Sequence, residues 1–176
     1  YKRQVPQRRE RVVFVGFRAD LGIEWSFPEA THSLEALLWE QVRTGDYWER
    51  HEIAKRDRVL DPRFRARGMA LLEKPADKPW LTVRDAIGDL PDPELQPELA
   101  AACLNHRFQG GARSYVGHTG SPLDEPAKTL KAGVHGVPGG ENMLRRADGS
   151  VRYFSVRESA RLQTFPDKYR FHGSWT

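Results

Sequence analysis

A short apolar run near the start of the chain limits the choice of folds more than any other feature. Val12 to Val15 are continuously apolar, and Gly16 follows them. Such a run is typical of a strand that is buried on both faces, as in a parallel sheet covered by helices. We therefore expect an α/β fold with a strand over residues 11–16.

The segment that precedes this run alternates with the period of two that extended backbone imposes. Gln7, Arg9 and Arg11 fall on one face of the expected strand. Arg8 and Glu10 fall on the other face. Two guanidiniums on one strand edge suit a contact with an anion or with the edge of a base. A charged, solvated strand start is an equally simple interpretation of so short a motif.

Composition narrows the class of protein and of partner. The 176 residues suffice for one domain or slightly more, and the formal net charge of +4 favours a polyanionic partner such as nucleic acid. An ordinary basic soluble protein fits that charge equally well. No segment approaches the roughly 20 apolar residues that span a bilayer, and no signal peptide is recognised.

The single cysteine, Cys103, excludes a disulfide framework and favours a reducing compartment. The first residue is Tyr1, and a strand motif follows almost at once. We therefore expect the chain to be part of something longer.

Caps and apolar periodicity predict several helices, over residues 33–44, 46–51, 83–87 and 98–104 and from Ser155 to just before Pro166. Ser33 and Thr82 are suited to be N-caps, and Ser155 with Glu158 forms an S-x-x-E capping box. The basic stretch over residues 55–67 has little apolar periodicity, so we expect a solvated loop there.

Glycines gather between residues 110 and 149, where nine of the 15 occur. Glycine permits close backbone approach, and basic side chains are interspersed in the same segment. Loops and short strands that lie against a nucleic acid would have this composition. A flexible surface region is the alternative.

Together these segments resemble the C-terminal half of bacterial cytosine-5 DNA methyltransferases. Residues 5–11 match the family pattern V-P-Q-x-R-x-R, and residues 82–91 read T-V-R-D-A-I-G-D-L-P as in the family. Residues 157–167 match R-E-x-A-R-L-Q-x-F-P-D, and residues 121–129 resemble the family segment just before that motif. The order and rough spacing agree across nearly the whole chain.

The resemblance implies a fold in the α/β class. It would comprise the C-terminal strand or strands of a Rossmann-like methyltransferase domain plus a small irregular α+β target-recognition domain. Residues 1–90 would end the catalytic α/β domain, residues 91–154 would form the target-recognition region, and residues 155–176 would return toward the catalytic domain.

The activity implied is transfer of a methyl group from S-adenosylmethionine to carbon 5 of cytosine in DNA. The family's nucleophile is a cysteine in a Pro-Cys motif, whereas Cys103 follows Ala102 and is expected to be a small buried apolar residue. The family's glycine-rich cofactor loop and Glu-Asn-Val motif do not occur in these residues. We therefore expect the chain alone to be inactive and to lack most cofactor-binding residues.

The resemblance assigns roles to particular residues. Arg11 would contact O2 of a flipped cytosine, Arg9 would support the pocket and Gln7 would orient the strand edge. Arg157, Glu158 and Arg161 would be structural, and no metal site is expected. By residue type and position among the glycines, the candidate DNA-binding residues are Arg113, Ser114, His118, Thr129, Lys131 and His135.

The expected partners are double-stranded DNA and a missing N-terminal methyltransferase half, which is joined in cis or supplied in trans. The expected location is the bacterial cytoplasm, where the protein would associate with the nucleoid through DNA. A recognition subunit of a split enzyme and a fragment that only binds DNA are alternatives. A nuclease or zinc module using Cys103, Asn105, His106 and His118 is a third, but it lacks four ligands at tight spacing.

Overall fold

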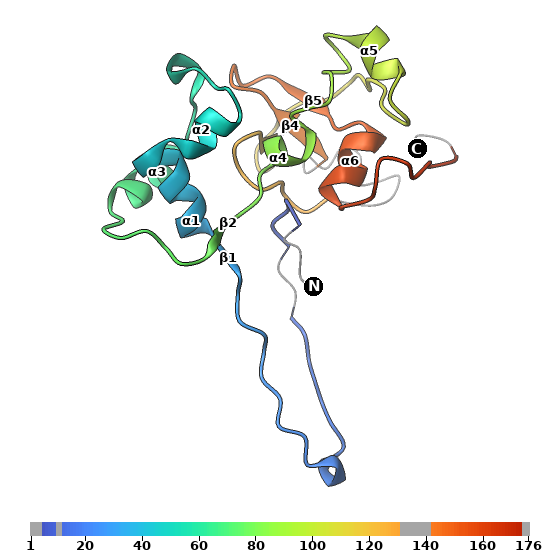
Figure 1. The fold of residues 1–176 in the computed structure, drawn as a ribbon. Helices are drawn as coiled ribbons and strands as arrows, with labels where there is room; N and C mark the ends of the chain where they lie inside the picture. Colours follow the sequence, from blue (N-terminus) through green and yellow to red (C-terminus); the bar gives the residue numbers. More distant parts are fainter. Residues whose placement is uncertain (1–4, 10–11, 131–141, 174–176) are drawn as a thin grey trace.

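The computed structural model describes residues 5–9, 12–130 and 142–173 of the chain. The fold is mixed α/β with small sheets. Figure 1 shows a helical unit containing α1 to α3, a second unit containing the strands β3 to β5, and an extended arm, residues 12–30. None of the described helices is long and apolar enough to cross a membrane.

The helical unit begins where Ser33 caps the first helix. Its elements are α1 (Leu34–Leu38), the π-helical turn η2 (Trp39–Thr44), α2 (Asp46–Arg50), the short 3-10 turn η3 (Lys55–Asp57) and α3 (Pro62–Met69). The Ser33 hydroxyl accepts a hydrogen bond from the Ala36 N–H at 3.1 Å, and Gly45 ends the helical run with a φ of +87°. Both predicted helices in this region, over residues 33–44 and 46–51, are confirmed.

The predicted loop over residues 55–67 is wrong in its second half, because α3 occupies it. The Asp61 carboxylate caps this helix, and Pro62 supplies a preset φ at its first position. Gly68 lets α3 approach η2 closely, since a Cβ there would lie 2.7 Å from Cγ2 of Val42. The helix is therefore specified by its start and by one close contact rather than by an apolar stripe.

A two-stranded parallel sheet lies between the helical unit and helix α4 (Val83–Ile87). Its strands are β1 (His32–Ser33) and β2 (Lys78–Pro79), with His32 opposite Lys78. Helix α4 comes soon after β2, and its N-cap Thr82 forms a full capping box with Asp85. The predicted helix over residues 98–104 is present as α5 (Pro97–Ala101), which ends three residues early.

The second unit is built on a three-stranded sheet in the order β3 (Ser121–Pro122), β4 (Met143–Arg145), β5 (Val151–Tyr153). β3 is parallel to β4, and β4 is antiparallel to β5. Helix α6 (Val156–Leu162) starts at the predicted Ser155–Glu158 capping box and packs against α4. The core of this unit consists of Val83, Ile87, Ala127, Leu144, Phe154 and Leu162.

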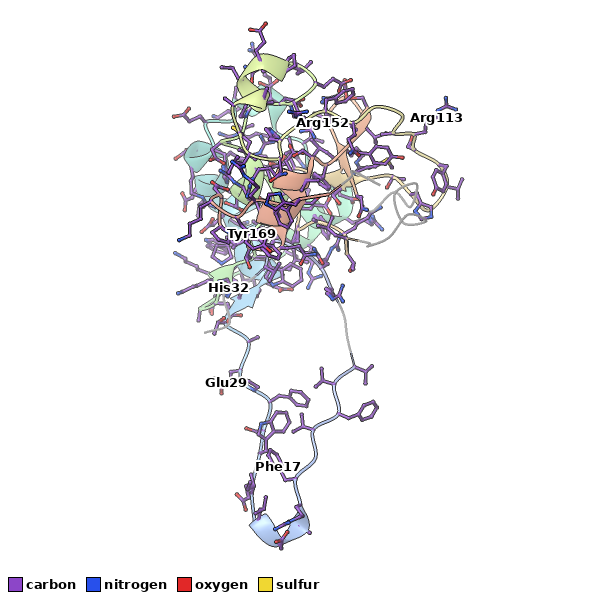
Figure 2. The ribbon with its side chains drawn as sticks, turned by 90° about the vertical axis from the view of Figure 1, so that its right-hand side faces the viewer. Phe17, Glu29, His32, Arg113, Arg152 and Tyr169 are labelled. Carbon is purple, nitrogen blue, oxygen red and sulfur yellow. The ribbon has the colours of Figure 1, made fainter. Side chains whose placement is uncertain are left out.

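The predicted strand over residues 11–16 is wrong for residues 12–16, the part that the structure describes. Val12 and Phe14 are 81% and 93% exposed, and every residue from Val12 to Ala30 is exposed. Figures 1 and 2 show the arm extending away from the two units. A strand buried on both faces needs neighbouring strands and covering helices, and no described element lies beside the arm.

Candidate functional site

Residues 5–9 are attached to the segment just after Asp124 by a short parallel pairing. The Arg8 N–H donates to the Ala127 carbonyl at 2.8 Å, and the Ala127 N–H donates to the Pro6 carbonyl at 2.9 Å. The Thr129 hydroxyl donates to the Arg8 carbonyl at 2.7 Å. Two segments more than a hundred residues apart in sequence are thus held in fixed register.

This pairing sets the environment of the side chains in the Q-x-R motif. The Gln7 amide nitrogen is buried and has no hydrogen-bond partner among the described residues. Arg8 forms an ion pair with Glu125 at 3.3 Å. Arg9 is exposed and has no ion-pair partner in the described part of the chain. Arg11 lies outside the described residues.

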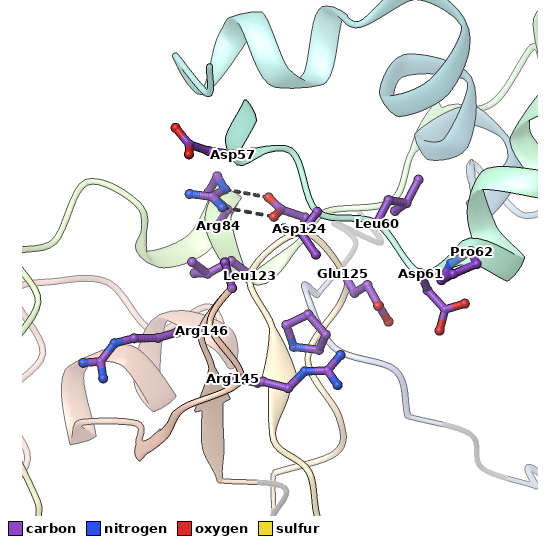
Figure 3. A pocket seen from close by; sticks show the side chains of 14 residues that line it. Asp57, Leu60, Asp61, Pro62, Arg84, Leu123, Asp124, Glu125, Arg145 and Arg146 are labelled. Carbon is purple, nitrogen blue, oxygen red and sulfur yellow. Dashed lines mark hydrogen bonds and ion pairs between the residues drawn. The ribbon is translucent and has the colours of Figure 1, made fainter. Parts of the chain in front are cut away.

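A buried polar network surrounds Asp124 and joins the helical unit to the second unit. We call Gln41, Tyr47, Thr82, Arg84 and Asp124 the Asp124 network. The Asp124 carboxylate accepts hydrogen bonds from Arg84 at 2.6 and 3.0 Å and from the Tyr47 hydroxyl at 2.9 Å. Figure 3 shows the two bonds from Arg84. Gln41 donates to the Asp124 carbonyl at 2.8 Å, and the Tyr47 and Thr82 hydroxyls lie 2.9 Å apart.

The protonation states within the Asp124 network follow from burial and charge. Burial raises the pKa of Tyr47 far above its ordinary value, and the negative charge of Asp124 raises it further. Tyr47 therefore stays a neutral donor at any physiological pH. Burial by itself lowers the pKa of Arg84, but its hydrogen bond to Asp124 and the Asp124 charge raise that pKa overall. A neutral hydroxyl and a cation thus stabilise one carboxylate.

A cavity of about 330 Å³ borders the Asp124 network, between α3, the 121–125 segment and β4 (Figure 3). Asp61, Glu125 and Arg145 are among its lining residues. Burial raises the pKa of Glu125, although the nearby Arg8 and Arg145 lower it. The walls therefore carry both signs of charge.

A second polar network ties α6 to β5 and to the residues after α4. Arg152 forms a buried ion pair with Glu158 at 2.7 Å and a further pair with Asp92 at 3.2 Å. Asp92 also pairs with Arg146 at 3.1 Å. The side chains of Arg152 and Glu158 are only 4% and 2% exposed. This network fixes the sheet relative to the C-terminal helix.

The other two residues predicted to be structural also bind within the chain. The buried Arg157 guanidinium donates to three backbone carbonyls, of Leu104, Pro166 and Tyr169, between 2.6 and 3.3 Å. Arg161 pairs with Asp167 at 2.7 Å and also with Asp89. These contacts leave neither guanidinium available as a simple surface charge.

The candidate DNA-binding residues occupy different environments. Arg113 and Ser114 are exposed on the loop between α5 and β3, and Arg113 extends away from the body in Figure 2. His118 is half-buried, and its ring lies 4.4 Å from that of Tyr115. Thr129 is engaged with the Arg8 backbone. Lys131 and His135 lie outside the described residues.

The residues of the zinc alternative do not form a ligand set. The His106 ring nitrogens lie 2.6 Å from the Ser155 hydroxyl and 2.7 Å from the Pro91 carbonyl, so both are occupied. In the described ranges no three histidine, cysteine or acidic side chains are grouped to hold a metal ion. Cys103 is partly exposed rather than buried as predicted, because α5 lies on the surface and leaves Leu99 61% exposed.

Sequence reasoning did not single out Tyr47 or Asp124 as site residues. Tyr47 lies in a helix with no sign of a partner 77 residues away, and Asp124 is one acidic residue in a polar segment. The available signal was that Asp124 and Arg84 lie in two segments that resemble family motifs. Only the folded chain shows that these side chains meet.

Comparison with known proteins identifies the family of the chain. Residues 2–176 match the family described as C-5 cytosine-specific DNA methylase. The chain is 28% identical to Type II methyltransferase M.Eco47II of Escherichia coli over 172 residues, which are 97% of this chain and 36% of that protein. It is 30% identical to Type II methyltransferase M.NgoFVII of Neisseria gonorrhoeae over 175 residues, 98% of this chain and 40% of that protein.

The chain thus spans less than half the length of these curated relatives. No solved structure matches it. Because the family match extends over almost the entire sequence, the chain belongs to the C-5 cytosine-specific DNA methylase family.

Proposed function

We propose that this chain is the C-terminal part of a DNA cytosine-5 methyltransferase, where it recognises a DNA sequence and positions a flipped cytosine. The observation that carries the proposal is the pairing of residues 5–9 with Ala127 and Thr129. It holds the Q-x-R segment beside a segment within residues 91–154, the proposed recognition region. One end of the chain can then hold a base while the other reads its neighbours.

The chemistry explains why an arginine-bearing strand is useful there. An enzyme that modifies carbon 5 of a cytosine must take that base out of the stack. The extruded base presents O2, and a guanidinium is a suitable donor to it because it is always charged and rigid. We assign that contact to Arg11, the support of the pocket to Arg9, and the orientation of the strand edge to Gln7.

Sequence recognition is assigned to residues 91–154. Base edges are read in the major groove by donors and acceptors on chain that can enter it. The exposed loop carrying Arg113 and Ser114 supports this assignment. His118, Thr129, Lys131 and His135 are the remaining candidates, with Thr129 limited by its bond to the Arg8 backbone.

The described residues do not fit S-adenosylmethionine, the methyl donor that the family implies. Folds that cradle a nucleotide cofactor do so with a glycine-rich turn between a strand and a helix. No such turn occurs in the described ranges, where Gly110 and Gly111 lie in a long loop that follows α5. The cavity beside Asp124 has charged walls and no aromatic ring. We therefore assign the cofactor site to portions of the enzyme that this chain does not span.

The exposed apolar arm supports the proposal that another part of the methyltransferase binds to this chain. Apolar side chains on both faces of residues 12–15 are suited to lie within a sheet. We propose that the remaining methyltransferase portion, joined in cis or supplied in trans, covers them in the bacterial cytoplasm. A recognition subunit of a split enzyme and a fragment that only binds DNA are the two alternatives. Methylation restored by adding the missing portion in trans favours the former.

The test uses the active enzyme that contains this chain, with bisulfite sequencing as the readout of methylated cytosine. Arg11→Ala should reduce methyl transfer on the order of 100-fold or more, if the contact strengthens toward the transition state, while DNA binding largely persists. Arg170→Ala, at an exposed arginine of the C-terminal segment, is the matched control and should methylate normally. Near-normal methylation by Arg11→Ala would refute the assignment.

A further inference from the structure

Asp124 is held from several directions at once. Its carboxylate accepts hydrogen bonds from the Arg84 guanidinium and the Tyr47 hydroxyl, and its carbonyl accepts one from Gln41. The residue is 8% exposed. Hydrogen-bond donors from η2, α2 and α4 therefore converge on Asp124, so these three elements together fix its position.

The backbone on either side of Asp124 is fixed to the start of α4. The Arg84 N–H donates to the Leu123 carbonyl at 2.8 Å, and the Val83 N–H donates to the Glu125 carbonyl at 2.9 Å. These two bonds and the Asp124 carboxylate form a continuous attachment of the segment to the helix N-terminus. The segment cannot shift unless this attachment changes.

Only two residues separate Asp124 from the pairing with the Q-x-R strand. Pro126, one of them, is buried and has its φ preset by its ring. Ala127, which follows it, is fully buried and exchanges backbone hydrogen bonds with Pro6 and Arg8. A displacement at Asp124 is therefore transmitted to the strand over a short and stiff connection.

We infer that Asp124, held by Tyr47 and Arg84, is a positioning residue for the cytosine pocket, which rests on the function proposed above. Its carboxylate locks the 123–127 segment, and that segment sets the place of Gln7 and Arg9. In this inference the network makes no contact with substrate. It acts by fixing geometry, and a misplacement of about 1 Å can cost on the order of 100-fold in rate.

The test is Asp124→Asn in the active enzyme, assayed for turnover, for DNA affinity and for base flipping with 2-aminopurine at the target position. Asparagine preserves size but removes the charge that Arg84 faces. We expect kcat to fall between about 10- and 100-fold and the 2-aminopurine fluorescence to fall with it. DNA affinity should change less than about threefold because the exposed loop is untouched.

Glu158→Gln is the matched control, since it makes the same carboxylate-to-amide change at another buried ion pair. At a temperature where circular dichroism shows it folded, this variant should keep normal fluorescence and kcat. Tyr47→Phe is the milder variant should Asp124→Asn fail to fold, because it removes one hydroxyl and keeps the ring. It should lower kcat and fluorescence in the same direction.

The inference is overturned if Asp124→Asn or Tyr47→Phe is folded and keeps wild-type fluorescence and kcat. It is equally overturned if Glu158→Gln loses both as strongly. A wild-type enzyme that neither methylates cytosine nor brightens 2-aminopurine would instead refute the proposed function. The two failures are therefore distinguishable.

Discussion

Single residues in this chain derive their roles from partners that are far away in sequence. Arg152 and Glu158 form one of the most buried ion pairs among the described residues, and the buried Arg157 donates to three backbone carbonyls. Buried charges are stable only when they are paired or hydrogen-bonded. The sequence identifies such residues as charged, but burial decides that they are structural.

Glu158→Gln should destabilise the protein, because it removes the more buried carboxylate from the 4% exposed Arg152 and leaves the pair with Asp92. Removing one partner of a buried pair costs about 3 kcal/mol or more in the free energy of unfolding. Urea denaturation measures the change. Asp20→Asn, at the exposed Arg18–Asp20 pair, is the control and should have little effect. Equal effects of the two variants would contradict the argument.

Asp92 should make stability depend on pH in the acidic range. Burial alone raises its pKa, but a hydrogen bond from the Glu94 N–H and the charges of Arg152 and Arg146 hold it below the ordinary 3.8. The contribution of Asp92 to the free energy of unfolding is therefore complete above pH 3.8. It is lost as the pH falls through the lower pKa of the folded state.

Urea denaturation across that pH range should show a flatter dependence for Asp92→Asn than for the wild type. The lower stability of the variant at neutral pH should converge on the wild type in acid. Parallel curves for the two proteins would show that Asp92 is not responsible.

At the scale of elements, helix starts were predictable and strand partners were not. Ser33, Thr82 and Ser155 cap the helices that the sequence predicts, because an N-cap hydrogen bond joins residues three positions apart. Helix α3 was missed although Asp61 and Pro62 mark its start, since it has no apolar stripe and its contact with Val42 through Gly68 is long-range. The parallel pairing of β3 with β4, which places Ser121 opposite Leu144, joins segments far apart in sequence, and no local pattern encodes it.

Gly120 precedes β3, and its replacement should disturb the sheet. It has a φ of +75°, and a Cβ there would lie 3.2 Å from both the Arg145 nitrogen and the Met143 oxygen. Gly120→Ala should cost about 1–3 kcal/mol of unfolding free energy. Gly117→Ala is the matched control, with a φ of +83° and nothing within 4 Å of the added Cβ. If Gly117→Ala lowered the unfolding free energy as much as Gly120→Ala, the contact of the added Cβ with Arg145 and Met143 would not explain the loss.

At the scale of the whole molecule, the arm and the two units have different sequence signals. The apolar run over residues 12–15 was predicted to form a buried strand, yet within the described chain it is exposed. A strand is buried only when other strands and helices pack against it, and the sequence of the strand does not identify those elements. Under the proposed function, the same reasoning makes the arm a candidate contact with the remaining methyltransferase portion.

Phe14→Asp should therefore weaken assembly without unfolding the chain. Phe14 is 93% exposed, so a carboxylate there costs nothing within this fold, but it cannot enter an apolar sheet. Methylation in trans with the missing portion should fall at least tenfold, on the order of 1.4 kcal/mol. Leu72→Asp, at another highly exposed apolar residue, is the control. Equal methylation by Phe14→Asp and the wild type would exclude the arm from the interface.

Exchange of residues 105–153 with those of a relative should change which sequence is methylated while cytosine remains the target base. The proposed function assigns sequence recognition to side chains in this region and the cytosine pocket to the segment at residues 5–11. Bisulfite sequencing of methylated DNA measures the preference. An unchanged target site would place recognition elsewhere.

The sequence by itself determined the family motifs, the helix caps and the distribution of charge, because each depends on residues that are close along the chain. The tertiary structure alone decided that Asp124 meets Tyr47 and Arg84, that Thr129 holds the Arg8 backbone, and that the apolar arm stands clear. Those outcomes depend on which distant segments share buried space. Local sequence patterns determine the charge and hydrogen-bonding capacity of a side chain, and tertiary packing determines which groups it contacts.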